Sequence, residues 1–212
     1  MRKFLDLTLT LEDGTRALDP DPISFVNKYR SIYQDGYNLS QVILNSHVGT
    51  HIDAPYHFLE QGVTLDRVPL NSLIGKARLL DFSYKKAKEL ITRKEIESYN
   101  SVISRDDIII LRTDWYKKFP SHEYGYDNPN VSTEAVEYLV QKKIKMLAVE
   151  SPTLNWEDNP DAHKILLSAG ILLVEGLAYL DKISTETFTF YAIPLKIKDI
   201  DGFPIRAFAE IA

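Results

Sequence analysis

Three of the five histidines in this chain lie within residues 47–57, and an aspartate lies among them. The segment over residues 46–58 reads SHVGTHIDAPYHF. Neutral imidazole is the commonest metal ligand in proteins, and a carboxylate adds the negative charge that holds a divalent cation. The segment therefore predicts a metal site that includes His47, His51 and Asp53.

The spacing of these residues favours an extended, bent segment over a helix. A helix would place His47 and His51 on one face but would leave Asp53 well off it. In an extended chain the three side chains are an even number of residues apart, so they all point to the same side. A straight strand would separate the two histidines by ~13 Å, which is too far for easy binding of one ion, so the chain must bend. Gly49 permits that bend and leaves space for an ion.

The alternative is that these side chains are polar loop residues or hydrogen-bonded core histidines. A lone histidine would favour that interpretation, but four potential ligands in this spacing favour the metal site. Pro55 imposes an extended or turn conformation that directs His57 back to the same place. Thr50 is expected to support the loop by hydrogen bonding.

The composition of the 212 residues is that of an ordinary globular protein, with 44% hydrophobic and 26% charged residues. That length suits one domain over residues 1–212. The net charge of −5 and the lack of a basic stripe argue against a nucleic-acid partner. With no cysteine there is no disulfide or thiolate chemistry. Asp6 interrupts the first apolar run, so no signal peptide is expected. No run of ~18 apolar residues follows, so no membrane span is expected. A cytoplasmic location fits both expectations.

Strand and helix patterns are interleaved along the chain and predict a mixed α/β fold. Strands are expected over residues 4–10, 40–46, 77–82, 107–112, 145–149, 171–174, 188–193 and 206–211. Helices are expected over residues 93–99, 133–142 and 161–167, the first with a Thr92–Glu95 capping box. Residues 119–130 are expected to form a loop that exposes His122, and residues 25–35 have no clear assignment.

The histidine segment also resembles the signature of the cyclase family of metal-dependent hydrolases, which includes bacterial kynurenine formamidase and isatin hydrolase. A second resemblance is His163 at the start of a helix and Glu175 at the end of the following strand. Two positions depart from the family pattern. Gly176 stands where the family commonly has Asn, and Glu150 stands where it commonly has Asp. Glu150 could keep the role of that carboxylate or lie on the surface.

The resemblance implies a swivelling β/β/α domain, with a mixed sheet flanked by helices, that forms a homodimer or tetramer. It also implies that His163 and Glu175 complete the site of His47, His51 and Asp53. Kynurenine formamidase-like members imply Zn²⁺, with two ions sharing a carboxylate, whereas isatin hydrolase-like members imply one Mn²⁺. The mixed nitrogen and oxygen ligands allow either metal, with Zn²⁺ expected first.

A bound divalent ion lowers the pKa of water and polarises a carbonyl, so the expected reaction is hydrolysis of a C–N bond in a small amide. His57 is not needed as a ligand and is assigned to proton transfer. The leading substrate is an aryl formamide such as N-formylkynurenine, and a lactam or carbamate is the alternative. A non-catalytic metal-binding protein is the rival from another class, but it has no evident use for His57. Aromatic residues that could line a substrate pocket, or else pack in the core, are Tyr56, Phe58, Trp115, Tyr124 and Trp156.

Overall fold

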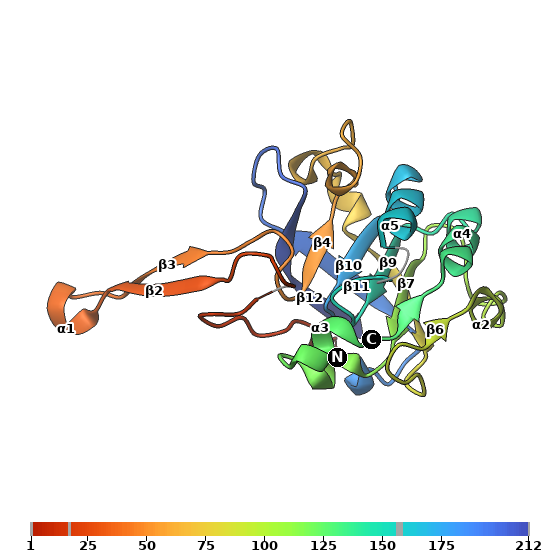
Figure 1. The fold of residues 1–212 in the computed structure, drawn as a ribbon, viewed down its shortest axis with the longest axis horizontal. Coiled ribbons are helices and arrows are strands. Elements are labelled where there is room, and N and C mark those ends of the chain that lie inside the picture. Colours follow the sequence, from red (N-terminus) through yellow and green to blue (C-terminus); the bar gives the residue numbers. More distant parts are fainter. Residues whose placement is uncertain (1, 17, 156–158, 212) are drawn as a thin grey trace.

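A closed, mixed β-barrel is the centre of the computed structural model, which describes residues 2–16, 18–155 and 159–211 (Figure 1). The barrel strands follow the order β12-β11-β5-β7-β9-β10-β4, and β4 pairs back to β12. Strand β1 adds to the outer edge of β12. The bounds are β1 Lys3–Asp6, β4 His51–Asp53, β5 Ile74–Asp81, β7 Ile108–Arg112, β9 Met146–Val149, β10 Leu172–Glu175, β11 Thr187–Pro194 and β12 Gly202–Ile211.

Strand β7 shows why the sequence pattern of the barrel is so apolar. Ile108 and Ile110 point into the barrel core, whereas Ile109 and Leu111 pack outside it among residues of the covering helices. Both faces of the strand are therefore buried, as is usual where parallel strands are covered by helices. Within this sheet, strands β5, β7, β9 and β10 are parallel to one another, and the other pairings are antiparallel.

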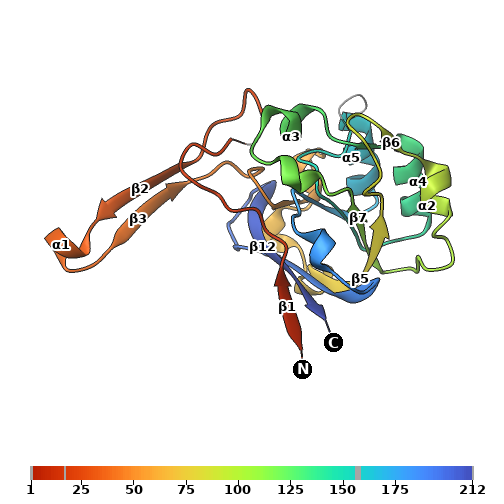
Figure 2. The same ribbon diagram turned by 90° about the horizontal axis from the view of Figure 1, so that it is seen from below.

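Three helices cover the outer face of the barrel: α2 (Arg93–Glu97), α4 (Thr133–Gln141) and α5 (Asn159–Ser168) (Figures 1 and 2). The predicted capping box of α2 is present, because Thr92 and Glu95 bond reciprocally. The mixed α/β prediction is confirmed. Barrel closure was not predicted, because the first residues of β12, which pair with β4, were not assigned to a strand.

A long arm projects from the barrel and consists of β2 (Phe25–Arg30), α1 (Ile32–Asp35) and β3 (Leu39–Ile43) (Figures 1 and 2). The two strands of the arm pair only with each other. The sequence left residues 25–35 unassigned and predicted the strand at 40–46, part of which is β3. It did not predict that this strand belongs to an arm outside the barrel.

The prediction of a loop over residues 119–130 is wrong in part, because α3 (His122–Tyr126) forms there after the N-cap Ser121. His122 is exposed, as predicted. A small sheet of β6 (Leu90–Ile91) and β8 (Asn130–Val131) lies nearby. Short 3₁₀ turns occur at Pro55–His57, Leu65–Arg67, Leu70–Ser72, Trp115–Lys118 and Leu180–Lys182.

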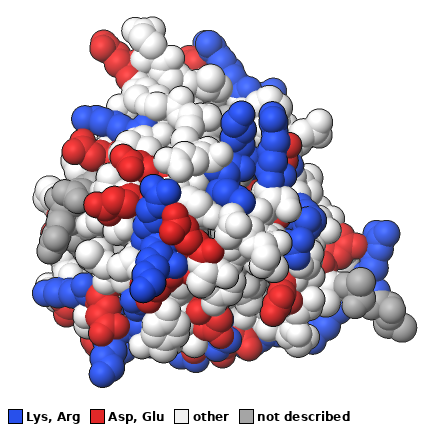
Figure 3. Space-filling model, turned by 90° about the vertical axis from the view of Figure 1, so that its right-hand side faces the viewer, with Lys and Arg blue, Asp and Glu red and all other residues white. Residues whose placement is uncertain are grey.

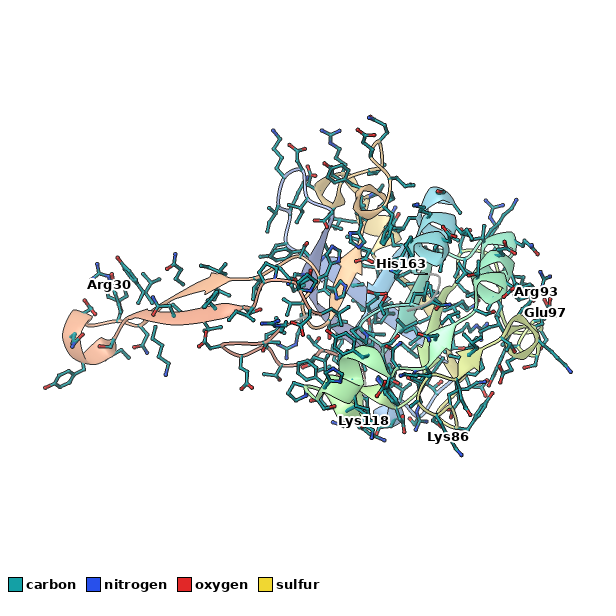
Figure 4. The ribbon with its side chains drawn as sticks, viewed as in Figure 1. Arg30, Lys86, Arg93, Glu97, Lys118 and His163 are labelled. Carbon is teal, nitrogen blue, oxygen red and sulfur yellow. The ribbon has the colours of Figure 1, made fainter. Side chains whose placement is uncertain are left out.

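The face formed by α2 and α4 carries charges of both signs, intermixed rather than separated into patches (Figure 3). The pair Arg93–Glu97 on α2, with 2.7 Å between Nε and Oε1, is one example (Figure 4). Such a surface gives no support for a nucleic-acid interface on this face. None of the helices in the described part of the chain has the length and apolar character to cross a membrane.

Candidate metal centre

Four buried side chains meet between the outer face of the barrel and α5. His51 and Asp53 project from the same face of β4, because Ile52 between them points into the barrel core. Glu175 on β10 lies directly opposite His51 in the register of the two strands. His163 reaches the same place from α5 (Figure 4). The exposure of these four residues does not exceed 3%.

The nitrogen and oxygen atoms of these side chains converge. His51 Nε2 lies 3.3 Å from Glu175 Oε2 and 3.6 Å from Asp53 Oδ1. His163 Nε2 lies 3.4 Å from Glu175 Oε1 and 3.8 Å from Asp53 Oδ2. Two histidines and two carboxylates thus face one another in a site removed from water.

The buried polar atoms of this group fit a divalent cation. His51 Nε2, Asp53 Oδ2 and Glu175 Oε1 have no hydrogen-bond partner within the described residues. The ring of His51 is oriented by its Nδ1, which donates to the carbonyl oxygen of Gly49 at 2.9 Å, so the Nε2 lone pair is left to face the carboxylates. Unpartnered buried polar groups are costly, and a cation would satisfy all three atoms.

Two glycines allow the backbone to approach closely beside the site. Gly49 has φ +65° and forms the bend that the sequence predicted. Gly176 has φ +68°, and a Cβ there would collide with the carbonyl oxygen of Gly49. No side chain fits at Gly176, so the departure from Asn is built into the packing. Thr50 Oγ1 supports the loop, as predicted, by accepting from the amide of Leu9 at 2.8 Å and donating to the carbonyl of Gly176.

His47 lies on the other side of Asp53 and forms a second group of potential ligands. Its Nδ1 is 2.9 Å from Asp53 Oδ1, and its Nε2 is 2.6 Å from Asp201 Oδ2. Burial alone would lower the pKa of His47, but the two carboxylates outweigh burial and raise the pKa to about 10. His47 therefore lies between two carboxylates, in a position that suits positive charge. The ligand atoms of His47, Asp53 and His57 lie within 4.8 Å of one another.

His57 is directed back to the site by the 3₁₀ turn that starts at Pro55, as predicted. Its ring stacks on His47, with 3.9 Å between centroids, and its Nδ1 lies 3.3 Å from Asp201 Oδ2. The side chain is 27% exposed, whereas His51 is buried. His57, at 27%, and His47, at 20%, are therefore the histidines of this site that are partly open to solvent, and His57 is the more exposed of the two.

Asp201 contacts both His47 and His57, and the sequence analysis did not identify it. Burial would raise the pKa of Asp201, but the hydrogen bonds to the two histidines lower it well below its usual range. The pKa of Asp53 is also lowered, because His47 outweighs the effect of burial. Gly202, the residue after Asp201, leaves room for His47, because a Cβ there would lie 2.7 Å from His47 Cε1, but no local sequence pattern identifies Asp201.

The aromatic residues that could line a substrate pocket lie in different surroundings. Trp115 and Tyr124 are buried in a small core cluster, so they are packing residues. Phe58 stacks on His163 with 4.6 Å between ring centroids, so it borders the site, whereas Tyr56 is 41% exposed. Trp156 lies outside the described residues.

Glu150 is completely buried, so the alternative that placed it on the surface is wrong. Its Oε2 accepts from the backbone amide and the hydroxyl of Thr113, at 2.6 and 3.0 Å. Burial raises the pKa of Glu150 to about 7 even though these hydrogen bonds act in the opposite direction. The carboxyl binds Thr113 and is not among the potential ligands described above.

The barrel and this buried group of ligands define a known class of protein. The Cyclase family model matches residues 5–156, so the chain belongs to the cyclase family. The chain is 27% identical over 208 residues to kynurenine formamidase of Bacillus cereus, covering 97% of this chain and 96% of that protein.

Solved structures show the same relationship in three dimensions. An isatin hydrolase bound to the product analogue thioisatinate superposes with a TM-score of 0.90 at 26% identity, covering 99% of this chain and 92% of that one. A predicted metal-dependent hydrolase from Bacillus stearothermophilus superposes with a TM-score of 0.83 at 26% identity, covering 99% and 98%.

Proposed function

We propose that this chain is a metal-dependent amidohydrolase that cleaves a C–N bond in a small amide. The observation that carries the proposal is the group of buried, unpartnered nitrogen and oxygen atoms on His51, Asp53 and Glu175 beside the solvent-accessible His57. Similarity to kynurenine formamidases and to an isatin hydrolase supports the same reaction class.

His51, Asp53, His163 and Glu175 would hold a divalent ion, and His47 would extend the site through Asp53. When bound, the ion would supply Lewis acidity toward water and the amide carbonyl. The site contains two groups of potential ligands that share Asp53, which supports one or two ions. Two carboxylates and imidazole nitrogens suit Zn²⁺ or Mn²⁺, and we propose Zn²⁺ first.

His57 would carry the proton from water to the leaving amine. Asp201 accepts at the Nδ1 of His57, so Nε2 is the nitrogen left to exchange protons with the substrate. The exposure of His57 gives a small molecule access to it, while the buried ligands stay removed from solvent. A protein that only binds metal would not need this arrangement.

The leading substrate is an aryl formamide such as N-formylkynurenine, in a step of tryptophan breakdown. Phe58, which stacks on His163, would offer an aromatic surface to such a substrate. The second candidate is a lactam such as isatin, favoured by the superposition on isatin hydrolase. We further propose that residues 1–212 form one homo-oligomeric domain of the swivelling β/β/α architecture.

Elemental analysis of freshly purified protein, paired with hydrolysis of N-formylkynurenine before and after chelation, tests the proposal. Bound Zn²⁺ or Mn²⁺ with chelator-sensitive hydrolysis is the expected result. Bound metal with hydrolysis of isatin alone would favour the lactam. If reconstituted protein holds no metal and turns over neither compound, the proposal is wrong.

A further inference from the structure

A cavity of about 560 Å³ lies where α4 and α5 end and where β9 and β10 begin. Its walls are formed by residues 105–106, 143–145 and 169–171, together with Ser72 and Val140. His163 lies near the start of α5, and Ala169 directly follows the end of this helix (Figure 4). The cavity is therefore separated from the candidate metal centre by about 9 Å along the helix axis.

Positive charge in this cavity is not balanced by carboxylates. The cationic side chains that line it are those of Arg105, Lys143 and Lys145. Neither Lys143 nor Lys145 forms an ion pair with any described residue. Arg105 lies 3.5 Å from Asp106, but these side chains are 71% and 72% exposed, so water screens the pair. The walls thus carry an excess of positive charge in a chain whose net charge is −5.

The buried carboxylate of Asp107, next to the cavity, is already bound. Its Oδ1 lies 3.1 Å from Lys76 Nζ, and its Oδ2 lies 3.4 Å from Arg78 Nε. The same Oδ2 accepts from the backbone amide of Ser104 at 3.0 Å. Because two cations and an amide share this carboxylate, its negative charge is not available to the cavity.

The backbone holds the ammonium of Lys145 in a fixed place. Its Nζ donates to the carbonyl oxygens of Asn71 and Ile74, at 3.1 and 3.0 Å. Gly75 leaves room for this group, because a Cβ there would lie 2.9 Å from the Nζ. An ammonium has three N–H donors, so one donor is left for a ligand in the cavity. The side chain is thus ordered before any ligand binds, which lowers the entropic cost of binding.

Lys143 occupies a backbone position that favours glycine. It has φ +56° just after α4, and Gly170 has φ +72° just after α5. The Lys143 amide donates to the carbonyl of Val140 at 2.9 Å, and the Gly170 amide donates to that of Leu167 at 3.0 Å. Backbone amides therefore cap both helices, and the Lys143 ammonium is not needed for capping. A cation kept in a strained conformation points to a use for its charge.

We propose that this cavity binds a small phosphate ester. The oxygens of a phosphate surround the phosphorus, so Arg105, Lys143 and Lys145 can contact them from different segments of the wall. A carboxylate offers only two oxygens in one plane. The carbon part of the ester would contact Val140 and Ile171, which line the same cavity. The proposed site contains no residue of the candidate metal centre, so it does not rest on the proposed metal function.

Isothermal titration calorimetry of the full chain with phenyl phosphate at pH 8 tests the site. This probe carries a ring and, above its second pKa of about 6, close to two negative charges. One probe per chain should bind with a Kd below about 1 mM. Absence of saturable binding would overturn the proposal. Phthalate, a ring with two carboxylates, should bind more weakly, and equal or tighter binding of phthalate would overturn the assignment to a phosphate ester.

Substitutions in the cavity test which residues bind the phosphate. Lys145→Met and Lys143→Gly should each raise the Kd of phenyl phosphate at least about tenfold, because each removes a charge-assisted hydrogen bond. Lys143→Gly should also raise the Tm by about 2–4 °C, because glycine fits the left-handed conformation, so its weaker binding cannot come from unfolding. The matched control Lys86→Met, an exposed lysine outside the cavity, should keep the wild-type Kd (Figure 4). Wild-type affinity in both cavity variants would overturn the proposal.

Amide chemical shifts and a chelator distinguish this site from the candidate metal centre. In the ¹⁵N-labelled chain, phenyl phosphate should shift the amides of residues 105–107, 143–145 and 169–171. Shifts confined to residues 47–57 would contradict the assignment. Chelation should leave the Kd unchanged, whether or not the proposed metal function is correct. Loss of binding on chelation would place the probe on a metal ion and overturn the proposal.

Discussion

Replacing the buried carboxyl of Glu150 by an amide should remove a pH dependence of stability. Burial, against the opposing hydrogen bonds of Thr113, raises the pKa of this carboxyl from 4.5 to about 7. Between these values the folded chain keeps a proton that the unfolded chain has released, so the free energy of unfolding falls as pH rises. The gap between 4.5 and about 7 corresponds to about 3 kcal/mol lost by pH 8. Glu150→Gln imitates the protonated carboxyl and avoids this loss.

Thermal unfolding between pH 5 and pH 9, with chelator in all samples, measures the effect of Glu150→Gln. The variant should match the wild type near pH 5 and unfold about 6–12 °C higher at pH 8, because about 3 kcal/mol shifts the Tm of a chain of this size by that amount. Glu137→Gln on the exposed face of α4 is the matched control and should follow the wild type. If the Tm values of Glu150→Gln and of the wild type change with pH in parallel, the raised pKa assigned to Glu150 is refuted.

Four further substitutions test the site. His57→Ala should lower kcat by about 10²–10⁴-fold and keep the metal, whereas Asp53→Ala should lose both the activity and the metal. Equal metal loss from the two variants in elemental analysis would contradict the assignment of His57 to proton transfer and of Asp53 to metal binding. Asp201→Asn should weaken metal affinity about tenfold and lower kcat, because Asp201 contacts both His47 and His57. If saturating metal restores kcat in full, Asp201 does not position His57. Gly176→Ala should lower the free energy of unfolding, measured by urea denaturation, by about 1–3 kcal/mol, because φ is positive at this residue and the new Cβ would collide with the carbonyl of Gly49. An unchanged urea midpoint would count against this packing.

Local patterns were enough to predict several local features of the fold, two of them in the histidine segment. The bend at Gly49, the turn at Pro55 and the capping box at Thr92 all depend on neighbouring residues, and each is present. The convergence of His163 and Glu175 on β4 was expected from family resemblance rather than from spacing. No local pattern could have shown that these residues meet.

The features that the sequence analysis missed depend on contacts between distant segments. Asp201 reaches His47 across 154 positions of the chain, and only the pairing of β12 with β4 brings them together. Asp53 lies between His47 and His51, so the two histidines belong to different groups of potential ligands. The arm was missed because its strands expose both faces and lack the alternation that identifies a half-buried strand.

The seam that closes the barrel coincides with the candidate metal centre. Strand β4 is only three residues long, yet it joins β10 on one side and β12 on the other, and it carries His51 and Asp53. The ligands can therefore converge only after the first and last thirds of the chain have come together. An ion that binds this arrangement favours the folded chain over the unfolded one by mass action. Under the proposed function, metal supply would then regulate the lifetime of the whole protein in addition to its catalysis, because the residues that would hold the ion lie at the seam that closes the barrel.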